Sequence, residues 1–339
     1  MTVRIAMDAM GGDAAPLEVV RGIVRVPAGE VDEIILVGDQ TQIESAFQKI
    51  RKHPPSFVRI HHASEVITME DIPVTAVKQK KDASMNVAMQ LVKDGKADAF
   101  VSAGNTGALV ASALLTLGRI KGIERPAVVL FIPTPTSEVM ILDVGATVNC
   151  KPKHLVQFAV MGSAYMERVK RIENPRVGIL NVGSEEDKGD NLAQESFPLL
   201  QKAPINFIGN VEGTQILEGK VDVAVCDGFV GNIVLKFLEQ IGLHIFRLLK
   251  EEFKSHPIAR LGIPIVAPAF SGMRKRVDHE EHGGSPLLGV NGVCFKIHGR
   301  SKAKAFRNIV PVVRDAVEGQ LVQKIADGAS RMDEAEVRA

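Results

Sequence analysis

Hydrophobic residues recur along the chain in short uninterrupted runs, and each run ends in a polar or glycine-rich cluster. Runs of this length without alternation are typical of strands that are covered on both faces of a sheet. The segments that show this pattern are Arg4–Asp13, Ile34–Asp39, Ala99–Gly118, Met140–Thr147, Val177–Asp190, Ile205–Gly213 and Val223–Asn232. They predict an open, mostly parallel sheet in an α/β protein.

Helical patterns separate many of these runs. Apolar residues at helical spacing, together with capping and stop residues, mark where these helices begin and end. The expected helices are Leu17–Val24, a segment that ends at Gly95, Gly107–Leu117, Pro152 to about Arg171, Gly231–Phe253 and a last long helix from about Ser301.

The remaining segments complete the expected order of elements. Val58–Val66 is a further strand, and Ala127–Ile132 forms a hairpin with Val139–Asp143. We expect a polar connector over Ile72–Lys81 and a charged, frayed tail from Ser330. No internal repeat or linker is evident, so we expect one large domain over residues 1–339.

In an open α/β sheet, ligands bind beyond the carboxyl ends of the strands. Polar side chains follow all seven apolar runs, and we expect them to point the same way and form a site. They are Asp8, Asp13, Asn105, Thr106, Asp143, Asn181, Lys188, Asn210, Glu212, Asp227 and Asn232.

The turn Ser102–Thr106, which precedes an apolar helix, is the centre of this arrangement. Glycines at positions 104 and 107 allow close approach of backbone or ligand, and a helix N-terminus favours anions. The alternative is that the turn needs small residues for packing. The turn by itself leaves both interpretations open.

Composition excludes several classes of function. The formal net charge is +1, aromatic residues make up 4%, and Tyr165 is the only tyrosine in a chain without tryptophan. A nucleic-acid-binding surface is therefore not expected. Three widely spaced cysteines predict neither a disulfide framework nor a metal site. With no signal segment and no apolar run of roughly 18 residues, we expect a soluble cytoplasmic protein.

Familiar catalytic motifs are absent. The sequence has no dinucleotide fingerprint and no P-loop, Ser184 is not in a nucleophile elbow, and His279 with His282 does not match a zinc helix. What remains are glycine-rich turns, amides, hydroxyls and a few cations such as Lys188 and Arg300, which are suited to holding an anion.

Two C-terminal stretches have alternative interpretations. Gly283–Gly289 with Lys296–Ser301 concentrates glycine, His298 and Arg300, either as a second anion-binding loop or as a turn with a helix cap at Ser301. Ser255–Met273 is mostly apolar, is broken by prolines and is followed by three basic residues. It suits either a membrane surface or a subunit interface.

Five motifs together resemble one family closely, the bacterial phosphate acyltransferases of phospholipid synthesis. They are MDAMGGD at 7–13, SAGNTGA at 102–108, NVGSEEDKG at 181–189, DGFVGN at 227–232 and HEEHGGSPLLGV at 279–290. The resemblance covers nearly the whole chain. It implies transfer of a fatty acyl group from acyl carrier protein to inorganic phosphate, which yields acyl phosphate.

The resemblance also implies a three-layer α/β/α fold related to phosphotransacetylases and isopropylmalate-type dehydrogenases. It further implies a homodimer, peripheral membrane contact and a downstream membrane acyltransferase that takes the product. Residues 230–275 are then the helical, apolar protrusion for dimerisation and membrane contact. Thr147, Asn149 and Lys153 depart from the family's stretch, whereas Asp143, Gly145, Lys151 and His154 match it.

This chemistry requires no activated serine or cysteine and no cofactor. Phosphate is already an anionic nucleophile, and a thiolate whose thiol has a pKa near roughly 8.5 leaves readily. The protein has to orient phosphate and stabilise the oxyanion. We expect Lys188, Asn105 and Thr106 to be catalytic. The expected substrate- and phosphate-binding residues are Asp8, Gly11, Gly12, Asp13, Ser102, Gly104, Gly107, Asp143, Gly145, Asn181, Asn210, Asp227, Asn232 and His298.

Three alternative functions remain open from the sequence. They are a phosphotransacetylase that uses acetyl-CoA, a dehydrogenase of related fold, and a non-catalytic carrier-binding scaffold. An acidic carrier would meet basic residues. The sequence offers Lys78, Lys80, Lys81, Arg274, Lys275 and Arg276 for that contact.

Overall fold

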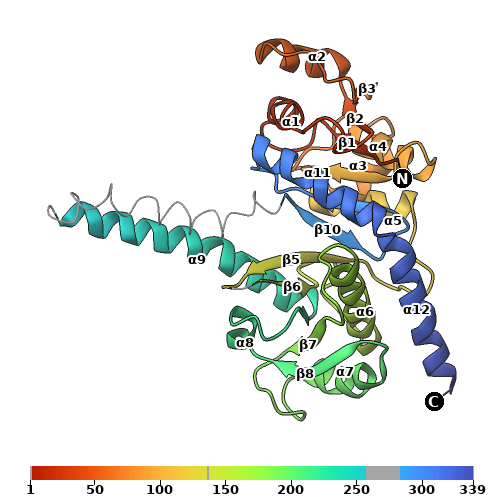
Figure 1. The fold of residues 1–339 in the computed structure, drawn as a ribbon, viewed down its shortest axis with the longest axis vertical. Helices are drawn as coiled ribbons and strands as arrows, with labels where there is room; N and C mark the ends of the chain where they lie inside the picture. The colour runs from red at the N-terminus through yellow and green to blue at the C-terminus, as the bar shows by residue number, and fades with distance from the viewer. Residues whose placement is uncertain (1, 136, 257–282, 339) are drawn as a thin grey trace.

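The structure, a computed structural model, describes residues 2–135, 137–256 and 283–338. Its centre is an 11-stranded sheet with the order β3-β2-β1-β4-β11-β10-β5-β6-β9-β7-β8 (Figure 1). The strands are β1 (Arg4–Asp8), β2 (Glu33–Gly38), β3 (Val58–His62), β4 (Ala99–Ser102), β5 (Ala127–Pro133), β6 (Glu138–Leu142), β7 (Arg176–Leu180), β8 (Asn206–Val211), β9 (Val223–Val225), β10 (Ser285–Leu288) and β11 (Val293–Lys296).

Helices cover both faces of this sheet. Those that pack on one face are α1 (Leu17–Ile23), α2 (Gln40–Lys49), α6 (Pro152–Arg168), α7 (Asn191–Lys202), α11 (Ala303–Glu318) and α12 (Leu321–Arg338). Those on the other face are α3 (Pro73–Gln79), α4 (Ser84–Lys93), α5 (Thr106–Thr116), α8 (Gly213–Leu217) and α9 (Gly228–Ser255). This layering confirms the α/β fold with a mostly parallel sheet.

Alternate residues of the central strands enter different cores, which explains the uninterrupted apolar runs. In β1, Ile5 and Met7 pack under α1 and α11, whereas Ala6 joins the cluster under α4 and α5. The first of these clusters continues into the other half of the sheet, where it includes Met140 and Val177. Strands that are covered on both faces have no polar side to alternate with.

The strand directions differ from the expectation that seven polar ends point the same way. Strands β3, β2, β1, β4 and β11 are mutually parallel, and so are β6, β9, β7 and β8. Three antiparallel pairs lie between these two sets: β11 with β10, β10 with β5, and β5 with β6. Three reversals make the two sets opposite in direction, so the polar ends form two groups.

The C-terminal third differs most from expectation. The segment expected to be a glycine-rich loop contains β10, and β11 follows it into the middle of the sheet. The expected last helix is two helices, since α11 ends before Gly319 and α12 continues to Arg338 where fraying was expected. The expected polar connector after Ile72 contains α3, which begins at Pro73.

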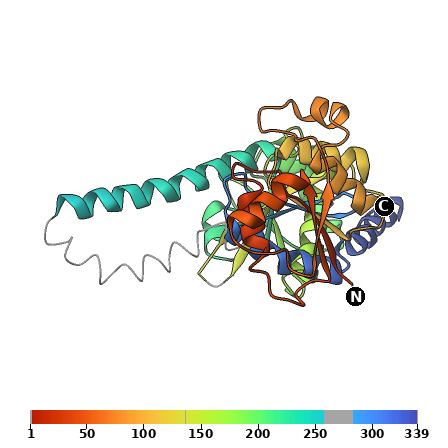
Figure 2. The same ribbon diagram turned by 90° about the horizontal axis from the view of Figure 1, so that it is seen from above.

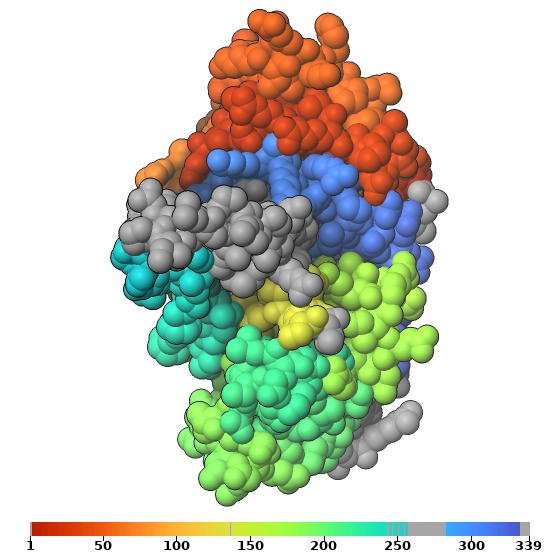
Figure 3. All heavy atoms as spheres, turned by 60° about the vertical axis from the view of Figure 1, so that its left-hand side comes forward, coloured from red at the N-terminus to blue at the C-terminus, as the bar shows by residue number. Residues whose placement is uncertain are grey.

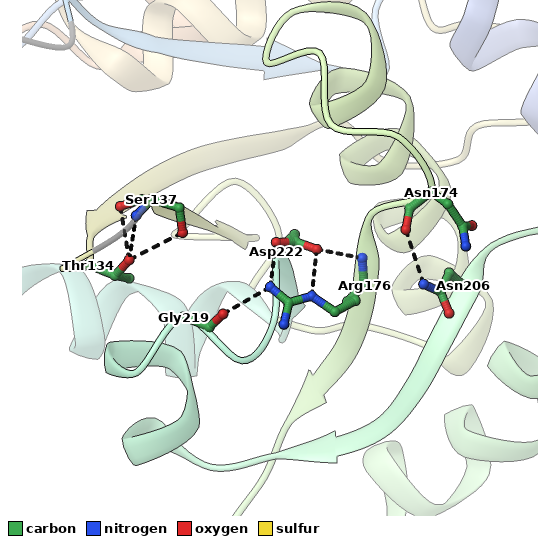
Figure 4. Close-up of polar contacts among 7 residues, drawn as sticks. All are labelled: Thr134, Ser137, Asn174, Arg176, Asn206, Gly219 and Asp222. Carbon is green, nitrogen blue, oxygen red and sulfur yellow. Dashed lines mark hydrogen bonds and ion pairs between the residues drawn. The ribbon is translucent and has the colours of Figure 1, made fainter.

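An arginine–aspartate pair holds the amino ends of the central strands in each half of the sheet. Arg176, the first residue of β7, donates from its backbone N–H, Nε and Nη2 to the carboxylate of Asp222 at 2.7, 2.9 and 2.8 Å, and from Nη2 to the Gly219 carbonyl at 2.9 Å (Figure 4). Arg4, the first residue of β1, makes the same four bonds to Asp98 and Gly95, at 2.8 to 3.1 Å.

The two pairs belong to a short repeat that the sequence analysis overlooked. GKADAFVSAGNTG at 95–107 corresponds to GKVDVAVCDGFVG at 219–231, with glycine, lysine, aspartate and both later glycines in equal positions. In each copy a buried strand, β4 or β9, leads into a helix, α5 or α9. The repeat places equivalent strand-to-helix turns in the two halves.

Helix α9 extends away from the body of the molecule (Figures 1 and 2). Exposed apolar side chains follow one face at helical spacing, among them Ile233, Phe237, Ile245 and Leu248. Length and composition alone would allow Gly228–Phe253 to cross a membrane. The sequence analysis did not expect such a helix, because it found no long apolar run. Core helices of other proteins pass the same test, so the stripe is the more informative feature.

Figure 3 shows the face from which α9 projects. N-terminal segments in red and orange form one end of the molecule, C-terminal segments in blue lie next to them towards the middle, and green segments from the middle of the chain form the other end. Residues 257–276, which include most of the apolar segment and its three basic residues, lie outside the described residues, as do His279 and His282.

Candidate active site

The first group of strand ends is organised around Asp8, the last residue of β1. Its carboxylate is buried and accepts hydrogen bonds from Ser84 Oγ and Ser102 Oγ, both at 2.6 Å. It also accepts the backbone N–H groups of Met10 and Gly11 at 3.1 Å. Burial raises the pKa of Asp8, and these four donors oppose that rise. Asp8 therefore fixes the first glycine-rich turn onto β4.

Lys296 is a cation of this group that the sequence analysis did not single out. It lies at the end of β11, in register with Ser102 of β4, and its Nζ donates to the Ile297 carbonyl. Burial lowers the pKa of Lys296 to about 8, although the carboxylates of Asp8 and Asp13 oppose that change. A signal was available, because Lys296 opens the KIHGRS stretch that the sequence analysis did identify.

The turn between β4 and α5 is held by Asn105. Its Oδ1 accepts the N–H of Ala108 at 3.1 Å, and its Nδ2 faces the carbonyls of Thr68, Met69 and Asp71 at 3.2 to 3.4 Å. The side chain thus ties the loop at 68–71 to the start of α5. Thr106, the first residue of α5, is exposed beside it.

Small residues in this turn serve packing. A Cβ at position 107 would lie 2.7 Å from Cγ of Pro73, so only glycine lets α3 approach α5 this closely. The backbone N–H of Gly104 donates to Ser102 Oγ at 2.9 Å. The packing interpretation of the turn is therefore correct, while its exposed rim at Thr106 stays available to a ligand.

Gly12, Asp13 and His298 join the first turn to the loop after β11. The N–H of Asp13 donates to the carbonyl of Gly299 at 2.8 Å, immediately after Gly12. From the same loop, Nε2 of His298 lies 4.0 Å from Oε1 of Glu239, a residue of α9. Through this contact, the first group of strand ends touches α9, the helix that begins at the second group of strand ends.

The second group is organised around Asp143, which follows β6. Its buried carboxylate accepts the N–H of Thr147 at 2.6 Å and that of Val128 at 2.9 Å. Burial raises the pKa of Asp143, and backbone donors, including those of Gly145, oppose that rise. The bond from position 147 uses the main chain, so the departure from the family's pattern at Thr147 does not remove it.

Asp227 begins α9 directly beside Asp143. Its Oδ1 accepts the N–H groups of Phe229 and Val230 at 2.7 and 2.8 Å. A Cβ at position 231 would collide with the carbonyl oxygen of Asp143, which keeps this residue a glycine as at the equivalent position 107. Asn232 is exposed and lies against Gly145. Asp143, Gly145, Asp227 and Asn232 are thus brought together.

The loop after β7 completes the second group. Asn181 Nδ2 donates to the carbonyl of Lys188 at 3.0 Å, and Asn210 Nδ2 donates to that of Glu185 at 2.6 Å. Oδ1 of Asn210 is buried without a hydrogen-bond partner in the described part of the chain. Lys188 is exposed, its side-chain stem lies over Gly183, and none of the ion pairs found among the described residues involves it.

These two groups are suited to binding an anion rather than to covalent catalysis. Burial raises the pKa of Cys150 and Cys294 to about 12 and that of Cys226 well above its usual value, so none of the three is an activated thiol. Within the described ranges, no three histidine, cysteine or acidic residues cluster as metal ligands. Besides the carboxylates that organise them, the two groups contain amides, hydroxyls, main-chain N–H groups, the imidazole of His298 and the amines of Lys188 and Lys296.

Known proteins resemble this chain over nearly its whole length. The model of the family described as "Fatty acid synthesis protein" matches residues 3–324. A phosphate acyltransferase of Desulfitobacterium hafniense is 49% identical over 324 residues, which are 95% of this chain and 96% of that protein. One of Heliobacterium modesticaldum is 49% identical over 325 residues, or 96% and 97% of the two chains.

Solved structures share the fold. A phosphotransacetylase from Streptococcus pyogenes superposes with a TM-score of 0.62 at 16% identity, covering 94% of both chains. A 4-hydroxythreonine-4-phosphate dehydrogenase from Klebsiella pneumoniae gives 0.53 at 12% identity, over 96% of this chain and 99% of that one. The family model matches nearly the full length of the chain, and the relatives are phosphate acyltransferases. The chain therefore belongs to the fatty acid synthesis protein family, a family of acyltransferases that includes the phosphate acyltransferases.

Proposed function

We propose that the protein transfers a fatty acyl group from acyl carrier protein to inorganic phosphate and releases acyl phosphate for phospholipid synthesis. One observation carries the proposal: two groups of strand ends, rich in amides and main-chain donors, are linked through the contact of His298 with Glu239 of α9, and none of the three cysteines is an activated nucleophile. Such a site suits a reaction whose nucleophile arrives already charged. The proposed setting is the cytoplasm, with no cofactor and no nucleic-acid partner.

In the proposed mechanism a phosphate oxygen attacks the thioester carbonyl carbon, and the carbon–sulfur bond then breaks. The carrier thiol leaves as thiolate and takes a proton from solvent. Lys188 neutralises the oxyanion or the phosphate, and the exposed start of α5 at Thr106 offers main-chain N–H groups to the same charge. Asn105 keeps this helix end in place, so we assign it a positioning role.

The test is release of free thiol from long-chain acyl carrier protein, measured with and without inorganic phosphate, with hydroxylamine to trap the product. Phosphate-dependent release and a trapped acyl hydroxamate are expected. Release without phosphate would identify a thioesterase and overturn the proposal. Absence of release with the carrier, together with release from acetyl-CoA, would identify the alternative.

That alternative is an acyl-CoA:phosphate acyltransferase, and the structural likeness to phosphotransacetylases favours it. Both reactions break the same bond, so the site chemistry does not separate them. The ratio of kcat/KM for the carrier-bound and the CoA-bound form of one acyl group decides between the two donors.

The assembly that we propose is a homodimer at the membrane surface. Helix α9 carries an exposed apolar stripe, with 54% of Ile233 and 65% of Phe237 exposed, and a second copy would cover it. The apolar segment that follows α9 is proposed to contact the bilayer, where a membrane acyltransferase takes the product. Flotation with anionic liposomes tests this contact, and a protein that stays at the bottom of the gradient contradicts it.

A further inference from the structure

A groove of about 720 Å³ lies outside both groups of strand ends. Leu114 near the end of α5 and residues 118–126, which connect α5 to β5, line it. The proposed mechanism uses none of these residues. The groove therefore raises the question of what it holds.

The loop that lines the groove is fixed from behind. The fully buried amide of Gln157 in α6 accepts the N–H of Glu124 at 2.9 Å and donates to the carbonyl of Gly122 at 2.8 Å. The N–H of Ile120 donates to the carbonyl of Gly289 at 3.1 Å, and Asn291 Nδ2 donates to that of Arg119 at 2.7 Å. Because the loop is held on both sides, a binding partner loses little conformational entropy in ordering it.

The groove is positively charged. It contains Arg119, Lys121 and Arg125, all exposed, and none of them takes part in an ion pair within the part of the chain that the structure describes. Arg119 Nη1 donates to the main-chain carbonyl of Glu124 at 2.6 Å, which leaves its charge uncompensated. The carboxylate of Glu124 points to α6 instead, 3.9 Å from Nζ of Lys153 and 3.2 Å from Nε2 of His154.

One end of the groove adjoins the second group of strand ends. Burial raises the pKa of the Cys150 thiol, the carboxylates of Asp143 and Asp227 raise it further, and the charge of Arg125 lowers it. Three residues after Arg125, the N–H of Val128 donates to Asp143. The end of the groove at Arg125 is therefore only three residues from a main-chain contact with Asp143.

The lysines at 78–81 are a weaker docking surface. Lys80 is engaged by the carboxylate of Asp71 at 2.6 Å and by the carbonyl of Val66 at 2.9 Å. That leaves two exposed lysines, Lys78 on α3 and Lys81 in the loop after it. Three cations on a fixed loop beside the site make the better complement to an acidic protein.

We infer that this groove is the docking surface for the acidic carrier protein that delivers the thioester, with Lys121 and Arg125 as its main contacts. The inference rests on the proposed function. The carrier's acidic surface lies against the loop 118–126, and its acyl-bearing arm enters past Arg125 towards Asp143. CoA has no such protein surface, so the groove distinguishes carrier-bound from CoA-bound donors.

Charge reversal of Lys121 tests the docking surface. Binding of fluorescently labelled carrier protein to the full-length enzyme is measured by anisotropy at low and high salt. We expect Lys121→Glu to weaken binding roughly tenfold at low salt and less at high salt, because exposed charges at an interface are screened. Its kcat/KM is expected to fall more with carrier-bound acyl donor than with the same acyl group on CoA.

Two matched variants serve as controls. Lys49→Glu makes the same charge change on α2, at the far end of the molecule, and should leave carrier binding unchanged. Lys78→Glu tests the lysine run, and a loss of binding there with none in Lys121→Glu would overturn the inference. Melting temperatures check that all three variants fold.

Binding and turnover separate the inference from the proposed function. Unchanged carrier binding by Lys121→Glu overturns the docking surface even if the wild type makes acyl phosphate. If the wild type binds the carrier, Lys121→Glu weakens that binding, and no turnover is seen, the docking surface is supported and the proposed reaction is refuted. A Lys121→Glu variant that becomes monomeric while retaining the carrier would show that the groove contacts a second copy, which also overturns the inference.

Discussion

Lys188 is an exposed cation in the loop after β7, and its main-chain carbonyl accepts a hydrogen bond from Asn181. Replacing it by alanine removes a charge without opening a cavity, so the fold should tolerate the change within about 0.5 kcal/mol. If it stabilises the oxyanion or phosphate, Lys188→Ala should lower kcat/KM roughly 100-fold. Phosphate-dependent thiol release measures the effect.

Lys220 supplies the control, because it is also exposed and its ion pair with Glu218 at 2.7 Å lies on the surface. Lys220→Ala should keep full activity. Equal turnover in Lys188→Ala and the wild type would remove Lys188 from the mechanism.

Lys296 predicts a pH dependence of stability. Its pKa is about 8 in the folded protein and near roughly 10.4 in an unfolded chain. Between about pH 8 and roughly 10.4, Lys296 is therefore protonated in the unfolded chain and neutral in the folded protein. The free-energy cost of burying its charge falls as the pH rises through this range. Relative to Lys296→Met, the wild type should gain stability across this range in urea titrations. Parallel curves for the two proteins would contradict the burial of a charged Lys296.

The residues that organise the two groups of strand ends were predictable where they directly follow an apolar run. Asp8, Asp143 and Asp227 were found in this way. Ser84 and Lys296 were missed, because the bond from Ser84 to Asp8 spans 76 residues and Lys296 ends a strand whose partner is almost 200 residues earlier. Such contacts depend on strand pairing that local sequence does not determine.

Among the elements, the two arginine–aspartate pairs differ in burial. The side chain of Asp222 is 9% exposed and that of Asp98 is 26% exposed, although each carboxylate accepts three hydrogen bonds from its arginine. We expect Asp222→Ala to lower the free energy of unfolding by about 2 kcal/mol, because it removes the acceptor of three hydrogen bonds from Arg176, including one from its partly buried main-chain N–H.

Asp98→Ala is the matched comparison and should cost less, because the Asp98 carboxylate is more exposed and water can take its place. Denaturant unfolding of both variants measures the difference. An equal loss in the two would show that burial does not set the strength of these pairs.

Element types were largely predictable, but their directions were not. Long apolar runs indicated β1, β4, β6 and β9, and helical spacing indicated α6 and α9. β10 contains Pro286 and lies between glycines, which is typical of a loop, yet it pairs on both sides. Because β10 and the β5–β6 hairpin reverse the sheet, the single site edge expected from the runs became two groups.

At the scale of the whole molecule, the apolar stripe on α9 predicts self-association. Phe237→Glu places a charge in the middle of the stripe and should convert a dimer into monomers in sedimentation velocity experiments, with the melting temperature of the body preserved. Lys236→Glu, one residue away on the polar side, is the control and should stay dimeric. A monomeric wild type, or a dimeric Phe237→Glu, would contradict the prediction.

The equivalent arginine–aspartate pairs have a consequence for how this architecture diversifies. They close the amino ends of the strands in both halves, while the turns and loops considered for the site follow the carboxyl ends. Loops at the carboxyl ends can therefore change in length and chemistry without loosening the sheet. One sheet can therefore carry loops of different length and chemistry, because the bonds that close the amino ends do not involve those loops.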